Sequence, residues 1–337
     1  MCIYKLEHVE MGRIYLPLKK RVNQNVKKQK VIVIAGPTAV GKTDISISIA
    51  KILNAEIISA DSMQVYKNMD IGTAKVTKEE QKLIPHHMID LIEINQSFNV
   101  KDYFDKAYEE LKKIIAKNKV PIIVGGSGFY IHVFLYGLPL GPPSDPIIRR
   151  QLEEKLQNFG AESLYERLQL LDPKYAKTIT ERDKHKIVRA LEIIMITNKK
   201  VSDIPKPTNS LNDIYDFRLW FLDLPRDLLY KKIDQRCDEM IKKGFIEEVE
   251  KLKKIGIEKN HSASQAIGYR QCLNYLNSQR SNEERERFIQ EFKKASRKFV
   301  KRQYTWFKKE KNFRWLNLNS VGMERAIEYI LQDYEQS

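Results

Sequence analysis

Residues 36–43 constrain the fold of this chain more than any other segment. They match the pattern G-x4-G-K-[ST]. A continuous apolar run at 31–35 precedes them, and residues 44–53 follow with helical spacing. Between a strand and a helix, such a glycine-rich turn directs its backbone N–H groups at phosphate oxygens. The segment therefore predicts a P-loop that binds a polyphosphate, formed by Gly36, Pro37, Thr38, Ala39, Val40, Gly41, Lys42 and Thr43.

Two side chains of this loop have their own chemistry. Lys42 supplies a mobile cation for phosphate, and the Thr43 hydroxyl can hold Mg²⁺. The loop indicates a polyphosphate without saying which one. A nucleotide hydrolase usually ends a later buried strand in an aspartate that helps to hold the metal. Here the buried run at 120–124 is followed by glycines and a serine, which argues against that class.

Strand and helix patterns alternate around the loop. Further strands are predicted at 56–59, 120–124, 217–222 and 313–316, and an amphipathic helix at 103–115. Alternation of this kind is typical of a parallel sheet with helices on both faces. We therefore predict an α/β fold, a P-loop parallel sheet flanked by helices.

A linker rich in glycine and proline, residues 137–146, interrupts this alternation. Three helical stretches follow it with no strand between them, at 147–159, 161–171 and 183–198. The sequence thus predicts a disordered basic leader at 1–29, a catalytic core made of 30–139 and 205–325, and a helical insertion domain at 140–204.

Charge and cysteine content narrow the partners and the compartment. The chain has 59 basic and 44 acidic residues, which gives a net charge of +15. This favours an anionic partner, foremost a nucleic acid, although a generally lysine-rich composition would look the same. No apolar run approaches the roughly 20 residues that span a membrane, so no membrane contact is expected. Cys2, Cys237 and Cys272 are too few and too far apart for a disulfide framework, which favours the cytoplasm.

Asp61 directly follows the strand predicted at 56–59. In an open parallel sheet, ligands bind at the carboxyl ends of the strands, so Asp61 should lie near the phosphate loop. Its carboxylate could accept a proton from an attacking N–H or O–H group, or it could cap the next helix. His86 and His87 lack further ligands at a familiar spacing, so we expect them to have packing or surface roles.

A set of short segments along residues 30–320 carries a resemblance. They are 36–43 (GPTAVGKT), 59–66 (SADSMQVY), 69–75 (MDIGTAK), 85–87 (PHH), 124–128 (VGGSG), 189–192 (RALE), 265–270 (QAIGYR) and 301–306 (KRQYTW). In this order they resemble the tRNA dimethylallyltransferases, also called isopentenyl-tRNA transferases. No cysteine follows Cys272, so the C-terminal zinc finger of many eukaryotic members is missing and the resemblance is to the bacterial form.

The resemblance implies a reaction. A dimethylallyl group would pass from dimethylallyl diphosphate to the exocyclic amine of the tRNA adenosine next to the anticodon, and diphosphate would leave. Lys42, with Mg²⁺ as the cofactor held through Thr43, would neutralise the leaving group. Asp61 would accept the proton of the amine. The expected partners are tRNA and dimethylallyl diphosphate, and we expect a monomer.

Matching positions also imply binding residues. Arg236 would reach the diphosphate, although Arg226 lies close to it in the sequence. Ser127 stands where the family usually has threonine. The residues expected to contact tRNA are Asp61, Ser62, Met63, Gln64, Ser127, Arg149, His185, Lys186, Ile187, Val188, Arg189, Gln265, Ala266, Ile267, Gly268, Tyr269 and Arg270.

A basic helix is predicted near the C-terminus. Two series step by four residues, and we expect them to form one stripe that meets tRNA phosphates: Lys293, Arg297 and Lys301, with Lys294, Lys298 and Arg302. A solvated charged face is the alternative. Phe292, Phe299 and Trp306 should form the apolar face of this helix.

Three other functions remain open at this stage. A small-molecule kinase, or a prenyltransferase that acts on free adenine nucleotides, would use the same loop and Asp61 without needing broad basic surfaces. A non-catalytic RNA-binding module would leave the loop unexplained.

Overall fold

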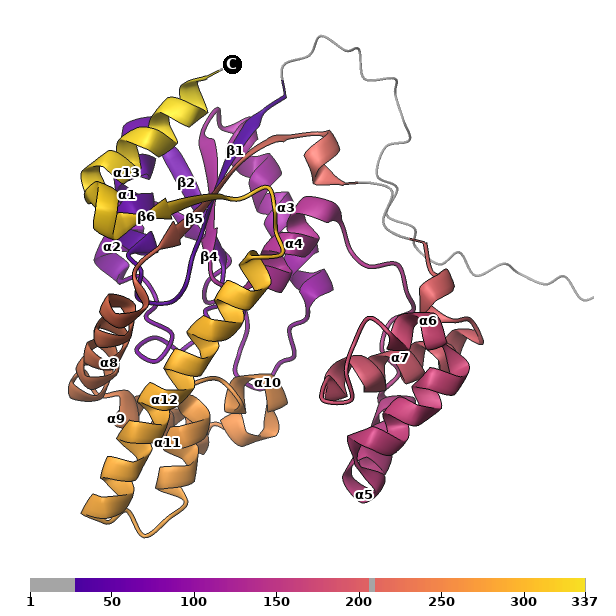
Figure 1. Ribbon diagram of the computed structural model, residues 1–337. Helices are drawn as coiled ribbons and strands as arrows, with labels where there is room; N and C mark the ends of the chain where they lie inside the picture. The colour runs from indigo at the N-terminus through magenta and orange to yellow at the C-terminus, as the bar shows by residue number, and fades with distance from the viewer. Residues whose placement is uncertain (1–27, 206–209, 337) are drawn as a thin grey trace, which may run out of the picture.

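The computed structural model describes residues 28–205 and 210–336. The leader predicted at 1–29 therefore lies outside the described residues, apart from 28 and 29. Within the described part, six strands form one parallel sheet in the order β3-β2-β4-β1-β5-β6 (Figure 1). In chain order they are β1 (Lys30–Ala35), β2 (Ala55–Ala60), β3 (His86–His87), β4 (Val120–Gly125), β5 (Asp216–Asp223) and β6 (Arg314–Asn317).

The central strand β1 shows why these runs are continuously apolar. Ile32 and Ile34 point to one face of the sheet and Val31 and Val33 to the other, and all four are fully buried. Helices cover both faces, so neither side of the strand can be polar. In register, Ala35 at the end of β1 lies between Gly125 of β4 and Phe221 of β5.

The helices of the main body divide between the two faces. On the face of Ile32 the buried side chains of α1 (Lys42–Leu53), α8 (Arg226–Lys242) and α9 (Phe245–Lys254) form one core. On the other face, α3 (Val100–Ala116) and α4 (Gly128–Tyr136) form a second core. The remaining helices of this body are α2 (Lys78–Leu83), α10 (His261–Ser264), α11 (Tyr269–Leu276), α12 (Asn282–Phe307) and α13 (Leu318–Glu335).

A separate helical lobe follows the linker after α4 (Figure 1). It contains α5 (Pro146–Leu171), α6 (Pro173–Ala176) and α7 (Lys184–Thr197), which share a small core of their own around Leu152, Leu168 and Ile187. Gly160, with φ 79°, breaks α5 between the two stretches predicted at 147–159 and 161–171.

The predicted fold is confirmed, including each predicted strand and its parallel pairing. The sequence patterns did not predict α4 or β3. Helix α4 is apolar on nearly all sides, so it has no helical periodicity, and β3 consists of two polar residues. No helix in the described ranges is both long enough and apolar enough to cross a membrane.

Candidate active site

The phosphate loop connects β1 to α1 and curls around the Lys42 ammonium. Lys42 Nζ donates hydrogen bonds to the carbonyl oxygens of Gly36 at 2.9 Å and Pro37 at 2.8 Å. Burial, helped by the nearby Arg236 and opposed by Asp61, lowers the pKa of Lys42 to about 7. Gly41 precedes α1 with φ 107°, a conformation that side chains other than glycine rarely adopt. The loop thus holds a cation that an incoming anion can stabilise.

A polar cavity of about 440 Å³ opens above this loop. It continues into a neighbouring polar groove that shares Thr43, Asp44, Arg236 and Glu239 with it. The charged side chains that line the cavity are Lys42, Asp44, Asp61, Lys232, Arg236 and Glu239. Cations on the wall and backbone N–H groups at the helix start suit a diphosphate.

The structure decides which of the two candidate arginines lies in this cavity. Arg236 on α8 lines it, and burial lowers the pKa of Arg236, whereas the charge of Asp61 opposes that shift. Arg226, at the start of the same helix, instead lies 5.1 Å from the ring centroid of Tyr230. Arg236 therefore has the position expected for a diphosphate contact.

Asp61 lies at the carboxyl end of β2, and its geometry is compatible with both roles considered for it. Its Oδ1 accepts hydrogen bonds from the N–H groups of Met63 at 2.8 Å and Gln64 at 3.4 Å, so it does cap the following turn. Within the described residues, Oδ2 has no hydrogen-bond partner. One carboxylate oxygen is thus structural, and the other is available for chemistry.

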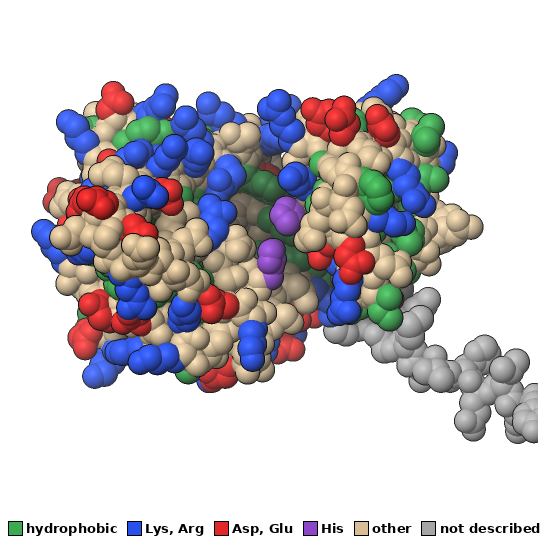
Figure 2. Space-filling model, turned by 90° about the horizontal axis from the view of Figure 1, so that it is seen from below, with side chains coloured by type: hydrophobic (Ala, Val, Ile, Leu, Met, Phe, Trp, Pro, Cys, Tyr) green, Lys and Arg blue, Asp and Glu red, His purple; other side chains and the backbone are tan. Residues whose placement is uncertain are grey.

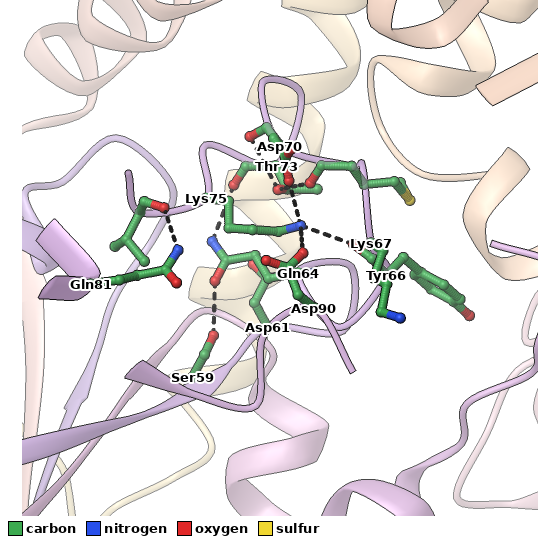
Figure 3. Close-up of polar contacts among 12 residues, drawn as sticks. Ser59, Asp61, Gln64, Tyr66, Lys67, Asp70, Thr73, Lys75, Gln81 and Asp90 are labelled. Atoms are coloured by element: carbon green, nitrogen blue, oxygen red, sulfur yellow. Dashed lines mark hydrogen bonds and ion pairs between the residues drawn. The ribbon is translucent and has the colours of Figure 1, made fainter. Parts of the chain in front are cut away.

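The loop after Asp61 is held by its own polar contacts (Figure 3). Gln64 accepts a hydrogen bond from Ser59 Oγ at 2.9 Å and donates to the Thr73 carbonyl at 3.3 Å. Lys75 binds Asp70 and Asp90, each at 2.6 Å, and its side chain is nearly buried. These contacts leave Gln64 occupied with the loop itself.

Glu248 on α9 fixes the far end of the same loop. Its carboxylate accepts hydrogen bonds from three successive backbone N–H groups, those of Asp70, Ile71 and Gly72, at 2.6–3.2 Å. It also accepts one from Tyr269 Oη at 2.7 Å. No sequence pattern indicated this role, because one glutamate among many on an amphipathic helix is usually a surface residue.

A second cavity of about 290 Å³ adjoins the first. The two share Thr38, Asp61, Thr73, Arg236 and Phe299 in their linings. The apolar side chains of the second cavity include those of Met63, Ile233, Met240, Ile267, Phe292 and Phe299. Asp61 therefore lines both the polar cavity at the phosphate loop and a second cavity that combines apolar and polar side chains.

Ser62 and Ser127 meet at the rim of this second cavity. Ser127 Oγ accepts a hydrogen bond from the Ser62 N–H at 3.1 Å, and the Ser127 N–H donates to the Ala60 carbonyl at 3.1 Å. The hydroxyl expected at position 127 thus joins the ends of β2 and β4.

In the helical lobe, two of the predicted tRNA contacts are engaged in an ion cluster. Arg149 and Arg189 both bind the fully buried carboxylate of Glu192, at 2.5 and 2.6 Å. Burial alone would raise the pKa of Glu192, but hydrogen bonds from Arg149, Ser144 and Arg189 outweigh it and lower this pKa to about 2. Arg189 also donates to the Pro142 carbonyl in the entering linker. These arginines hold the lobe to its linker.

The other residues of the lobe that were predicted to contact tRNA are partly exposed and partly buried. His185 and Lys186 are exposed at the start of α7. Ile187 and Val188 are 0% and 3% exposed in the core of the lobe. Their side chains pack in this core with those of α5 and so hold α7 in place, and the contact with tRNA expected for them stays a prediction.

Residues 265–270 divide in the same way. Gln265 and Arg270 are exposed, and Ile267 lines the second cavity. Ala266 and Tyr269 are nearly buried but also line that cavity, so the contact with tRNA expected for them stays a prediction. Gly268 has φ 86°, and a Cβ there would lie 2.7 Å from the ring of Phe292.

The basic stripe predicted on α12 was wrong in one respect, because two of its six cations are bound by carboxylates, whereas Lys301 of the same series is exposed. Lys293 and Arg297 turn toward α8, where they bind Asp238 at 2.7 Å and Asp234 at 2.5 Å. The second series remains exposed, and with Arg270 it lines a groove of about 250 Å³: Lys294, Lys298 and Arg302.

The apolar face predicted for α12 was also wrong in part. Phe292 is buried, but Phe299 lines both cavities and Trp306 is 37% exposed. The buried face instead runs through Phe288, Phe292, Ser296, Val300, Gln303 and Phe307. The heptad spacing of three aromatic residues was a poor guide because the true buried row includes polar side chains.

Gln303 is a site residue that the sequence did not indicate. It is 5% exposed and accepts a hydrogen bond from the Thr38 N–H at 3.1 Å. Its amide nitrogen donates to the Gly126 carbonyl at 3.1 Å, and a Cβ on Gly126 would lie 2.3 Å from that nitrogen. The available signal was the position of Gln303 within segment 301–306, one of those that carry the resemblance.

An aspartate does follow a later buried strand, contrary to the expectation from residues 120–124. Strand β5 lies next to β1 and ends in Asp223, so a later buried strand does end in an aspartate. Asp223 accepts a hydrogen bond from Tyr304 Oη at 2.5 Å and does not line the phosphate cavity. It is thus committed to fixing α12.

Metal ligands are scarce in the described ranges. No group of three or more His, Cys, Asp or Glu side chains there could hold a metal ion. His87 binds Glu56 at 2.7 Å and Glu110 at 3.0 Å, which agrees with the packing role expected for it. Mg²⁺ is commonly held by one or two protein oxygens together with substrate phosphates. Thr43 and Asp44 at the phosphate cavity fit that kind of site.

Fold and site together define a P-loop enzyme in which a polyphosphate cavity meets a second cavity at one carboxylate. The family model described as IPP transferase matches residues 64–310. The chain is 52% identical to a tRNA dimethylallyltransferase of Protochlamydia amoebophila, over 98% of both chains, and 44% identical to one of Chlamydia pneumoniae, over 91% and 90%. The chain therefore belongs to the tRNA dimethylallyltransferase (IPP transferase) family, and the predicted family and enzyme class are confirmed.

Two solved structures support the same family and fold. A tRNA isopentenylpyrophosphate transferase from Bacillus halodurans is 37% identical with a TM-score of 0.66, over 91% of this chain and 96% of that one. A eukaryotic dimethylallyltransferase, described as acting on tRNA, is 27% identical with a TM-score of 0.71, over 89% and 78%.

Proposed function

We propose that this enzyme transfers a dimethylallyl group from dimethylallyl diphosphate to the exocyclic amine of an adenosine beside the anticodon of tRNA. The observation that carries the proposal is the meeting of the two cavities at Asp61. A donor with its diphosphate at Lys42 and Arg236 would place its allylic carbon near that carboxylate. The family relatives named tRNA dimethylallyltransferase support the same reaction.

The residues present account for each step. The carbon–oxygen bond to diphosphate breaks as the adenine nitrogen bonds to carbon, and Lys42 and Arg236 stabilise the leaving diphosphate. Mg²⁺ held through Thr43 would neutralise further negative charge on that group. Asp61 Oδ2 accepts the proton that the amine loses. Its Oδ1 stays bound to the turn, which keeps the carboxylate oriented.

The basic surfaces support tRNA as the acceptor over a free nucleotide. The exposed cations Arg270, Lys294, Lys298 and Arg302 form a groove that meets the second cavity at Ile267 and Arg302. Neither a kinase substrate nor a single adenine nucleotide would need this extended surface.

The test offers labelled dimethylallyl diphosphate with Mg²⁺ and either unmodified tRNA or AMP. We expect label in tRNA only, and no hydrolysis of ATP by the enzyme alone. Comparable transfer to AMP would overturn tRNA as the acceptor. Appreciable ATP turnover without tRNA would instead favour the kinase alternative.

A further inference from the structure

One row of exposed side chains on α12 consists of cations and ends in an aromatic residue. Lys294, Lys298, Arg302 and Trp306 step by four residues, so they lie in a row. The first three are cations that line the basic groove. Trp306 follows them as a large aromatic side chain left 37% exposed.

Trp306 is held firmly in spite of this exposure. A Cβ on Gly128 would lie 2.3 Å from the Trp306 ring, so α12 approaches the start of α4 closely at this point. Phe129, 43% exposed, lies edge-on to Trp306 with ring centroids 6.0 Å apart. His132 lies 6.2 Å from Trp306 and is fixed by Glu310 at 2.8 Å. The aromatic platform, as we call Trp306 and Phe129, is thus exposed and ordered.

The aromatic platform lies near the second cavity, because a residue close to each of its two aromatic side chains lines that cavity. Ser127, directly before Gly128, lines that cavity, and so does Arg302, one turn before Trp306. Figure 2 shows the hollow between the main body and the helical lobe, with basic and histidine side chains on its walls.

We propose that Trp306 stacks against the base of a nucleotide next to the target adenosine, with Phe129 edge-on beside it as a support, while Arg270, Lys298 and Arg302 bind the adjoining phosphates. The proposal rests on the proposed function. Cations followed by rigid exposed aromatic rings are the combination that binds single-stranded nucleic acid, because phosphates need charge and every base has a face that can stack. A protein partner would not explain the three cations in the same row.

The experiment uses the full-length enzyme and an anticodon stem-loop RNA without any prenyl donor. The fluorescent base 2-aminopurine replaces the nucleotide on either side of the target adenosine in two separate RNAs. Stacking on Trp306 quenches this fluorescence. We expect quenching at one of the two positions with the wild-type enzyme. Trp306→Leu should abolish it and weaken RNA binding about 10-fold, whereas Trp306→Tyr should retain most of both.

Trp315→Leu is the matched control, because Trp315 is 39% exposed but packs on Phe221, 4.1 Å away, outside this face. It should leave the quenching unchanged. Phe129→Leu provides a second variant if Trp306→Leu lowers the melting temperature, and it should also reduce quenching.

Equal quenching by the wild type, Trp306→Leu and Phe129→Leu would overturn the platform, as would the absence of quenching at both positions. Either result could accompany normal prenylation of tRNA by the wild type, which would leave the proposed function standing.

Discussion

The carboxamide oxygen of Gln303 on α12 accepts a hydrogen bond from the Thr38 N–H in the phosphate loop, at 3.1 Å. Because the same carboxamide donates to the Gly126 carbonyl after β4, one buried side chain joins three parts of the site. The helix that carries the exposed cations is thereby fixed directly to the loop expected to bind diphosphate.

Replacing Gln303 should therefore disturb the donor site more than the RNA site. Gln303→Met leaves the Thr38 N–H and the Gly126 carbonyl without this partner, at a cost of about 1–3 kcal/mol. We expect inorganic diphosphate to bind about 10-fold more weakly, an effect of about 1.4 kcal/mol. Affinity for tRNA should stay close to that of the wild type. Titration calorimetry measures both.

Tyr304→Phe is the matched control for Gln303→Met. It removes the hydroxyl bound to Asp223 but touches no atom of the phosphate loop. If both variants bind diphosphate equally well, Gln303 is not a positioning residue for the loop.

Diphosphate binding should take up a proton at Lys42. Because burial lowers the pKa of Lys42 to about 7, the ammonium form of the free enzyme declines as pH rises above that value. A bound anion favours the charged form, so binding at pH about 8 should draw a proton from solution. Calorimetry in buffers of different ionisation enthalpy measures this uptake.

The variant Lys42→Arg distinguishes proton uptake by Lys42 from any proton that diphosphate itself gains or loses on binding. Arginine stays charged at this pH, so uptake should fall by up to one proton while the contribution of the ligand is unchanged. Identical uptake by the two proteins would exclude Lys42 as the group that titrates.

The variant Asp61→Asn should lower the rate of the chemical step and leave the folded structure of the site intact. The asparagine oxygen can still accept from the Met63 N–H, so the turn should persist. The variant cannot accept the amine proton, and the single-turnover rate should fall about 10²–10⁴-fold. Affinities for tRNA and diphosphate, and the melting temperature, should remain near wild type. A rate within about threefold of wild type would leave Asp61 with its capping role alone.

Because of Glu192, the stability of the helical lobe should decrease as the pH falls below about 4.5. The pKa of Glu192 in the folded protein, about 2, lies below its ordinary value of 4.5. Its stabilising contribution is therefore complete above pH about 4.5 and is lost as pH falls toward 2. Near neutral pH, Glu192→Gln should lower the free energy of unfolding by about 3 kcal/mol, because it breaks a buried ion pair.

Hydrogen exchange of α5–α7 at several pH values reports this effect locally. Glu153→Gln, an exposed glutamate on α5, is the control and should change little. The assignment fails if acid weakens protection of the lobe equally in wild type and Glu192→Gln.

The sequence allowed the fold and the phosphate end of the site to be predicted, because those features are local. A glycine loop between a buried strand and a helix, with Asp61 after the next strand, carries its chemistry in adjacent residues. Long-range partners carried no such signal. Glu248 reaches the backbone of Asp70 across the fold, and Glu192 gathers Arg149 and Arg189.

The basic residues of α12 show the same limit. Spacing by four placed Arg297 and Lys298 in one stripe, but adjacent residues point about 100° apart on a helix. Only the position of α8 shows that Asp234 takes up Arg297 and that Lys298 remains exposed. Packing between helices determines which basic residues form ion pairs within the protein and which remain exposed, and no local sequence pattern indicates that packing.

The two cavities extend in different directions beyond Asp61. The phosphate cavity continues into the polar groove past Thr43 and Glu239, whereas the second cavity continues into the basic groove at Arg302. A donor and an acceptor bound as proposed would therefore reach the same carboxylate through different openings. Neither would have to leave for the other to enter, and diphosphate could depart while the RNA stays in place. An inhibitor confined to the polar groove should accordingly compete with the prenyl donor and leave the affinity for tRNA unaltered.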